Sequence, residues 1–292
     1  MDIIINFHSE VRRYYIFNIA FWEKESFELG EKNVYRYNKT KEFAFYQAEE
    51  YSNSNSRKGI LEFILNEIEK SIPEDFETIE ELKKYIVSSC ENAYIDINSY
   101  CIKSYSYGKE EIMYKAVEEE KEEFKSFIIS LNEKRLRYSE PLFYRRVLKD
   151  EEAEEIKNLI VESRRNFRRN EEDSLFGDYF FIDKKVTPKI LRNILINHGI
   201  KKIYEIDTSK EAYFEIDVDM FNPYGKVNNK DTDIVNPYER INREKFFSSS
   251  DMDWVIYADH EDYIRIDGKW LIDDIISDVP EIKNILNEYV FK

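Results

Sequence analysis

Apolar residues recur every three or four positions in several segments of the chain, which is the spacing of one face of an α-helix. The segments with this period are 60–68, 78–90, 109–136, 150–169 and 187–198. Thr78 and Glu81 have the spacing of a capping box, and Thr187 before Pro188 suits the start of a helix. We therefore predict helices over these segments.

Other segments are rich in β-branched and aromatic residues, or alternate apolar with polar residues, and both patterns are typical of strands. The segments in this class are 14–22, 34–37, 42–46, 93–107, 142–148, 201–207, 212–220, 254–258 and 263–266. The last four are predicted to pair as two hairpins. The polar stretch YSNSNS, residues 51–56, predicts a loop, and His8 is predicted at a hairpin turn.

The order of these elements indicates the fold class. Strands and helices are interleaved without the regular spacing of βαβ units, which predicts an α+β fold with mainly antiparallel sheets and packed helices. The polar stretch RLRYSEP ends at Pro141 and is the predicted boundary between two subdomains. Both subdomains, 1–140 and 141–292, are expected to be α+β.

The composition disfavours several classes of enzyme. Of 292 residues, seven are Gly and three are His. Loops that cradle phosphates depend on Gly, because Gly lets the backbone approach a ligand with positive φ. The motifs GxGxxG, GxxxxGK[ST] and GxSxG are absent from the sequence. We therefore expect no cofactor, and interpret the chain as a binding protein rather than an enzyme.

Charge is unevenly distributed along the chain, whose formal net charge is −16. Residues 141–204 hold 11 acidic and 14 basic residues (+3), whereas residues 205–292 hold 21 and 10 (−11). Nucleic acids and anionic membranes bind cationic surfaces, so an acidic chain is a poor ligand for either. We expect instead a protein partner with a basic surface, and the opposed charges of the two segments suggest a homo-oligomer.

The sequence also predicts a compartment. It has no apolar run near the ~18 residues of a membrane span and no secretory signal at its start. We therefore expect a cytoplasmic protein. Cys90 and Cys101 are interpreted as reduced thiols, and a disulfide that closes the short loop between them is the alternative.

Residues 217–244 consist of two consecutive copies of a 14-residue repeat, which align without a gap. DVDMFNPYGKVNNK is followed by DTDIVNPYERINRE, and six of the fourteen positions are identical. Asn-Pro-Tyr suits a turn in the first copy and a helix start in the second. The Asp pairs allow two interpretations, either carboxylates that face solvent or a partner, or oxygen ligands for Mg²⁺ or Mn²⁺. The candidate metal ligands are Asp217, Asp219, Asp231, Asp233 and His260.

Two groups of residues are candidates for partner binding. The first is acidic and aromatic, because strand alternation puts carboxylates on one side and tyrosines are good interface anchors. It comprises Glu215, Asp217, Asp219, Tyr224, Asp231, Asp233 and Tyr238. The second is a cationic patch with members four residues apart on a helix, for which complementing a helix C-terminus is an alternative role. It comprises Arg164, Arg165, Arg168 and Arg169.

Two functional hypotheses follow from these features. The first is a non-enzymatic acidic protein of bacterial or phage origin that blocks a partner, as an inhibitor, a toxin-immunity factor or an anti-defence protein. Its partner would have a basic groove, as a nucleic-acid-handling enzyme does. The alternative is a divalent-metal-dependent phosphodiesterase or nuclease that uses the four Asp residues of the repeat, with His260 assisting.

Overall fold

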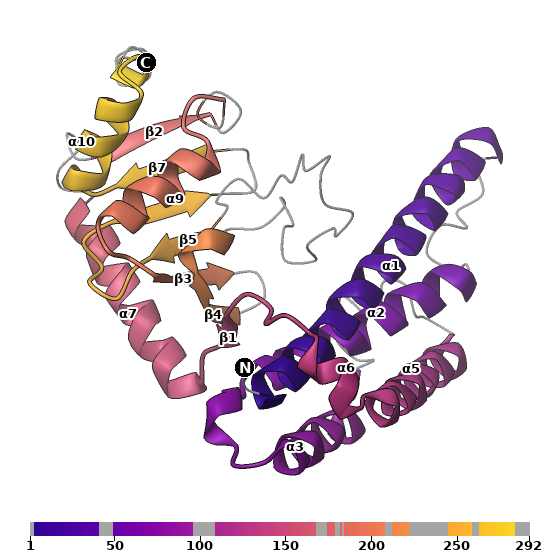
Figure 1. Cartoon of the computed structure of the whole chain (residues 1–292). Coiled ribbons are helices and arrows are strands. Elements are labelled where there is room, and N and C mark those ends of the chain that lie inside the picture. The colour runs from indigo at the N-terminus through magenta and orange to yellow at the C-terminus, as the bar shows by residue number, and fades with distance from the viewer. Residues whose placement is uncertain are drawn as a thin grey trace. The chain divides into compact units, whose positions relative to one another are not determined.

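The chain forms two compact units, one helical and one built on a β-sheet (Figure 1). The computed structural model describes residues 3–40, 49–95, 109–167, 174–178, 182, 184–207, 212–221, 245–258 and 263–283. Among these, residues up to Leu142 belong to the helical unit and residues from Phe143 belong to the sheet unit.

The described part of the helical unit contains helices and no strand. Its elements are α1 (Ile3–Thr40), α2 (Glu49–Glu69), the 3-10 turn η1 (Pro73–Asp75), α3 (Ile79–Asn92), α5 (Glu110–Ser130) and α6 (Glu133–Arg137). The start of α3 is as predicted, because the Thr78 side chain accepts a hydrogen bond from the backbone N–H of Glu81. The predicted helix 109–136 is two helices, and Asn132 caps the second by accepting from the N–H of Arg135.

The strands predicted at 14–22 and 34–37 are wrong, because both segments lie inside α1. Aromatic residues favour strands intrinsically, but their burial here follows the period of a helix. Tyr15 is fully buried whereas Phe17 is 71% exposed. The Tyr15 ring packs against the ring of Phe124 in α5, with ring centroids 4.7 Å apart. Two other predicted strands lie wholly or largely outside the described residues, namely 42–46 and 93–107.

The loop predicted at 51–56 is also wrong, since these residues form part of α2. Serine disfavours helices because its hydroxyl competes for backbone hydrogen bonds. Here the Ser56 hydroxyl donates to the carbonyl of Ser52, one helical turn earlier, at 2.7 Å. The buried Ser54 hydroxyl accepts from Ser26 of α1 at 2.9 Å. Small side chains with satisfied hydroxyls therefore allow α2 to pack closely on α1.

Two buried ion pairs join the long helices of this unit. Arg12 of α1 lies 2.9 Å from Glu69 of α2, and both side chains are almost completely buried. Arg57 of α2 lies 2.7 Å from the buried carboxylate of Glu120 in α5, and its guanidinium also covers the ring of Trp22. A buried charge without its partner is costly, so these pairs favour one alignment of the helices over others.

His8, predicted at a hairpin turn, is instead buried in α1. Its Nε2 lies 3.4 Å from the carbonyl oxygen of Ile68. Burial, reinforced by the positive charge of Arg12, lowers the pKa of His8 to about 3, and the Ile68 contact opposes this shift. The imidazole is therefore neutral in the folded protein at neutral pH.

Acid is expected to destabilise the helical unit through His8. Its folded pKa lies below the ordinary value of 6.5, so the unfolded state binds the proton first and stability falls as pH drops below 6.5. The loss is about 1.4 kcal/mol per pH unit. Between pH 6.5 and 5 the His8→Gln variant should lose about 2 kcal/mol less than the wild type in urea unfolding. Equal losses in the two proteins would contradict this assignment.

The sheet unit is built on one seven-stranded antiparallel sheet. Its strands are β1 (Arg145–Val147), β2 (Ser174–Asp178), β3 (Lys202–Asp207), β4 (Ala212–Asp217), β5 (Lys245–Ser248), β6 (Val255–Ala258) and β7 (Tyr263–Asp267). Their order across the sheet is β1-β4-β3-β5-β6-β7-β2. Both predicted hairpins are confirmed, as β3–β4 and β6–β7. The strand predicted over 212–220 ends earlier, at Asp217, where the 3-10 turn η3 (Val218–Met220) begins.

Helices cover both faces of this sheet because its strands carry apolar residues on both sides. One face packs against α9 (Pro188–Asn197) and α10 (Lys269–Asp278), and the other packs against α7 (Asp150–Phe167). The predicted start and end of α9 are confirmed, since the Thr187 side chain accepts from the N–H of Ile190 and Gly199 follows with a φ of 77°. The fold is α+β with an antiparallel sheet, as predicted.

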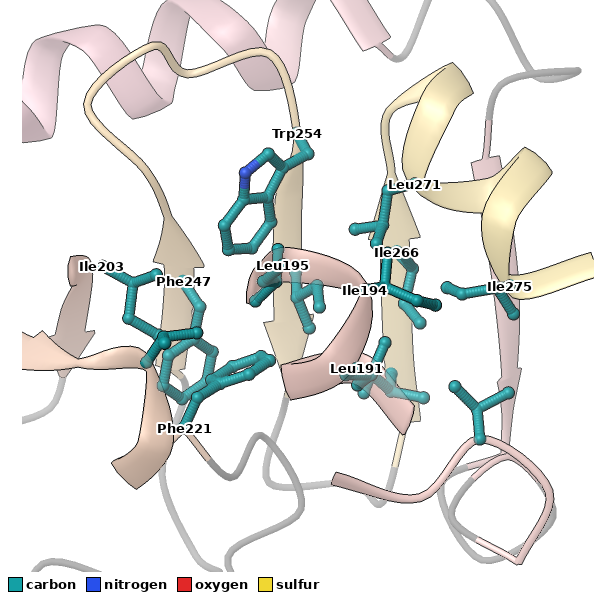
Figure 2. Close-up of a cluster of buried hydrophobic side chains, with 14 of the residues drawn as sticks. Leu191, Ile194, Leu195, Ile203, Phe221, Phe247, Trp254, Ile266, Leu271 and Ile275 are labelled. Carbon is teal, nitrogen blue, oxygen red and sulfur yellow. The ribbon is translucent and has the colours of Figure 1, made fainter. Parts of the chain in front are cut away.

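Trp254 is the largest fully buried side chain of the core between α9, α10 and the sheet (Figure 2). Its ring lies against Phe221, which in turn packs on Phe247 with ring centroids 5.1 Å apart. The backbone of Gly268 lies so close to Trp254 that a Cβ at residue 268 would be 2.8 Å from the Cβ of Trp254. The φ of Gly268, 121°, also favours glycine.

No helix among the described residues is long and apolar enough to cross a membrane.

Candidate functional site

The predicted acidic row on 212–220 divides into two parts. Glu215 and Asp217 lie on β4, on the face opposite to the buried Phe214 and Ile216. Asp219 lies beyond the end of the strand, in η3, and is exposed. The alternation predicted to residue 220 therefore holds only as far as Asp217.

Glu215 and Asp217 have hydrogen-bond partners within the sheet unit. The carboxylate of Glu215 accepts from the Tyr144 hydroxyl, and it lies 3.5 Å from Arg146 and 3.7 Å from Lys202. The carboxylate of Asp217 accepts from the backbone N–H of Tyr144 at 2.9 Å. These two side chains thus stabilise the pairing of β1 with β4, whereas Asp219 is exposed.

Arg146 connects the same edge of the sheet to α7. Its guanidinium donates two hydrogen bonds to the carboxylate of Glu152, at 2.7 and 3.1 Å. These bonds lower the pKa of Glu152 below its ordinary value, and they raise the pKa of Arg146. Both groups are therefore ionised at neutral pH, and the pair is a structural link between β1 and α7.

A second group of charges is buried on the opposite face of the sheet. Glu205 of β3 lies between two cations, with Lys245 at 2.7 Å and Arg145 at 3.8 Å. The Arg145 guanidinium covers the ring of Phe214, at 3.7 Å from its centroid. Opposite charges compensate one another here, which is the usual condition for burying ionised groups.

Several predicted site residues cannot be placed. Tyr224, Asp231, Asp233 and Tyr238 of the repeat lie outside the described residues, as do His260, Arg168 and Arg169. Arg164 and Arg165 lie in the last turn of α7, which is consistent with the position of basic residues near a helix C-terminus.

The candidate metal site is only partly described. Within the described ranges, no three His, Cys, Asp or Glu side chains converge on a point that could hold a metal ion. Of the predicted ligands, Asp217 already accepts a backbone hydrogen bond and Asp219 lies in a different element. Asp231, Asp233 and His260 fall in segments that are not described.

Cys90 is a free, buried thiol in α3. Burial raises its pKa to about 11, so the thiol is protonated at neutral pH and is a poor nucleophile. Cys101, its potential disulfide partner, lies outside the described residues.

An acidic and aromatic surface does exist in the described part of the sheet unit, but its centre is Trp270. The indole of Trp270, in the first turn of α10, lies against the imidazole of His198 at the end of α9, with ring centroids 4.1 Å apart. Its Nε1 donates to Asp253 at 2.9 Å, and the His198 Nε2 lies 2.6 Å from Asp274. We call Trp270, His198, Asp253 and Asp274 the Trp270 patch.

The surroundings of the Trp270 patch are acidic and partly apolar. Asp253 and His198 are exposed, and the neighbouring residues Asp273 and Ile196 are exposed as well. Lys269 lies 3.3 Å from Asp273 and offsets part of the negative charge. The patch is therefore a half-buried tryptophan with one carboxylate at its indole N–H and a second carboxylate bonded to the imidazole that packs on its ring.

His198 caps the C-terminus of α9, at the end of the helix predicted over 187–198, but the sequence pattern does not predict the patch as a unit. The local sequence DGKWLIDD does hold a signal, because Trp270 and Asp274 are four residues apart and lie on one side of a helix. Asp253 and His198 come from other segments, so their approach depends on the packing of α9 and α10 on the sheet.

Comparisons with known proteins identified no relative. No protein-family model matches the chain, and neither curated proteins nor solved structures contain a significant match.

Proposed function

We propose that this protein acts by binding another protein through its acidic surface, and that it blocks a basic partner without catalysing a reaction. The observation that carries this proposal is the Trp270 patch, in which the tryptophan is held by the Asp253 carboxylate and the His198 imidazole. Tryptophan is strongly enriched among the residues that dominate binding energy at protein interfaces. Residues 205–292, which include Trp270, carry a net charge of −11, and net negative charge attracts a basic partner.

The patch is preorganised for binding. Asp253 holds the indole at its N–H, and the His198 ring restricts one of its faces, so little rotational freedom remains to be lost when a partner docks. The His198 imidazole is itself oriented by Asp274. A side chain with fixed orientation contributes more net affinity than an equally large flexible one.

Arginine is the side chain that best complements this arrangement. A guanidinium stacks on an indole ring and donates paired hydrogen bonds to a carboxylate. The Asp253 carboxylate lies at the indole N–H, and the Asp274 carboxylate lies at His198, whose ring packs on the indole. Surfaces rich in arginine are typical of proteins that bind nucleic acid. A partner of this kind would be blocked by an acidic protein that covers its basic groove, as in inhibition, toxin immunity or anti-defence.

The proposal predicts a partner whose binding depends on Trp270. The immobilised wild-type chain should retain a basic protein from a lysate of the organism that encodes it, and salt should release that protein. With the purified partner, Trp270→Ala should weaken binding about 30-fold, equivalent to about 2 kcal/mol, in isothermal titration calorimetry. The partner's own activity should fall as the complex forms.

The matched control is Val161→Ala, which shortens an exposed side chain of α7 in the same unit. This variant should bind the partner as the wild type does. Equal affinities of the wild type and Trp270→Ala, or a partner whose activity does not change in the complex, would exclude the proposed role of the patch.

A further inference from the structure

We propose that the groove between α2 and α3 of the helical unit is a second binding site, and that it accepts a basic amphipathic helix of a partner protein. The groove has a volume of about 640 Å³ and is lined by both helices. It lies in the helical unit, so the inference is independent of the function proposed for the Trp270 patch.

One helix supplies most of the groove wall. Glu81, Tyr85, Ser88 and Asn92 of α3 are spaced at four, three and four residues, so they form a continuous stripe along three turns. Phe63 of α2 lines the opposite wall. The groove is therefore elongated in the direction of the helices.

The groove offers aromatic contacts that the fold leaves open to solvent. Phe63 is 37% exposed and packs against Tyr94, which is itself 66% exposed, with ring centroids 5.8 Å apart. Tyr85 lies between the walls and donates a hydrogen bond to the backbone carbonyl of Glu67 at 3.1 Å. Neighbouring exposed rings at the edge of a groove are typical of a protein-binding surface.

The charge around the groove favours a basic occupant. Glu67, Glu81 and Lys84 line the groove, and Lys70 pairs with Glu67 at 2.7 Å, so the excess of negative charge comes from the surrounding segment. The segment 74–92, which contains α3, has six acidic residues and two basic ones. Lysine or arginine beside apolar anchors would therefore gain favourable electrostatic energy along this wall.

A helix fits this groove better than an extended peptide does. An extended peptide gains affinity by pairing its backbone with a free strand edge, and both walls here are helices whose backbone groups are bonded internally. A third helix can instead place its side chains between the ridges of α2 and α3. Its apolar anchors would recur every three or four residues to follow the stripe on α3.

A synthetic peptide tests this inference directly. The probe is an amphipathic helix of about 14 residues, or four turns, with leucines on one face and lysines beside them. A second peptide carries glutamates in place of the lysines. Fluorescence anisotropy with the full chain should show micromolar binding of the lysine peptide and at least tenfold weaker binding of the glutamate peptide.

Variants in the groove should weaken binding of the lysine peptide about tenfold, because they remove an anchor or add a repelling charge. The two variants are Phe63→Ala and Ser88→Lys. Their matched controls, Tyr114→Ala and Ser130→Lys, change exposed residues of α5 and should bind as the wild type does. Circular dichroism establishes that each variant is folded.

Three results would overturn the inference. These are equal losses in the groove and control variants, equal binding of the two peptides, and no binding of the lysine peptide below about 1 mM. The Trp270→Ala variant should bind the lysine peptide normally, so failure of the groove and failure of the Trp270 patch are distinguished.

Discussion

Replacement of Arg12 by methionine is expected to destabilise the helical unit by about 3–5 kcal/mol. The guanidinium of Arg12 lies 2.9 Å from Glu69, and the two side chains are 3% and 0% exposed. Methionine preserves much of the side-chain volume but leaves the buried Glu69 carboxylate without this cation. Hydrogen exchange of α1 and α2, followed by mass spectrometry at increasing urea, measures the change where it occurs.

The double variant Arg12→Met/Glu69→Leu should recover a large part of this loss, because no uncompensated charge remains in the interior. An exposed ion pair provides the control. Arg137 and Glu133 lie one helical turn apart in α6 and are 71% and 75% exposed, so Arg137→Met should change stability by less than about 0.5 kcal/mol. If Arg12→Met were as mild as Arg137→Met, the buried pair would have no special role in the bundle.

Truncation of Trp254 to alanine is expected to destabilise the sheet unit by about 3–5 kcal/mol. The indole is fully buried, and it packs against Phe221 between the sheet and the covering helices (Figure 2). The backbone at Gly268 already lies close to the Cβ of Trp254, which limits how far this side of the cavity can close. Hydrogen exchange of the backbone amides of β6, which follows Trp254, and of β7, which precedes Gly268, measures the loss of stability.

Trp254→Phe should cost less than half as much as Trp254→Ala. Phenylalanine retains most of the apolar contact, and it removes an indole N–H that has no hydrogen-bond partner in the described structure. Val161→Ala, which shortens an exposed side chain of α7, should have almost no effect. Similar effects for all three variants would show that Trp254 is not the centre of this core.

Much of the sheet unit could be predicted because its signals are local. Thr187, Pro188 and Gly199 mark the ends of α9, and each acts through backbone groups within one helical turn. The hairpins β3–β4 and β6–β7 join strands that are close in the sequence. In such elements the residue pattern and the hydrogen bonds that it predicts lie in the same short segment.

The N-terminal residues were harder to interpret because their intrinsic preferences and their packing disagree. The segments 14–22 and 51–56 have the composition of a strand and a loop, yet both are helical. Contacts from other helices decide this outcome, such as Phe124 against Tyr15 and Ser26 against Ser54. Tertiary packing commonly outweighs propensities of less than about 1 kcal/mol per residue.

In the candidate sites, too, local patterns could be predicted from the sequence but contacts between distant segments could not. The carboxylates of Glu215 and Asp217 were recognised from strand alternation, but their main partner, Tyr144, is more than seventy residues away. The Trp270 patch combines three separate segments, and the groove of the helical unit combines two. Single-sequence patterns contain no information about which distant side chains will meet.

The sequence by itself determined the α+β class, most helices of the C-terminal half, the two hairpins and the acidic character, since these follow from local periodicity, capping residues and composition. The tertiary structure decided that residues 14–22 and 51–56 are helical, that Glu215 and Asp217 stabilise the sheet, and that Trp270 contacts Asp253 and His198. The physical reason is that helical and strand periods are properties of neighbouring residues. Burial, ion pairing and ring contacts are instead settled by segments that meet only after the chain has folded.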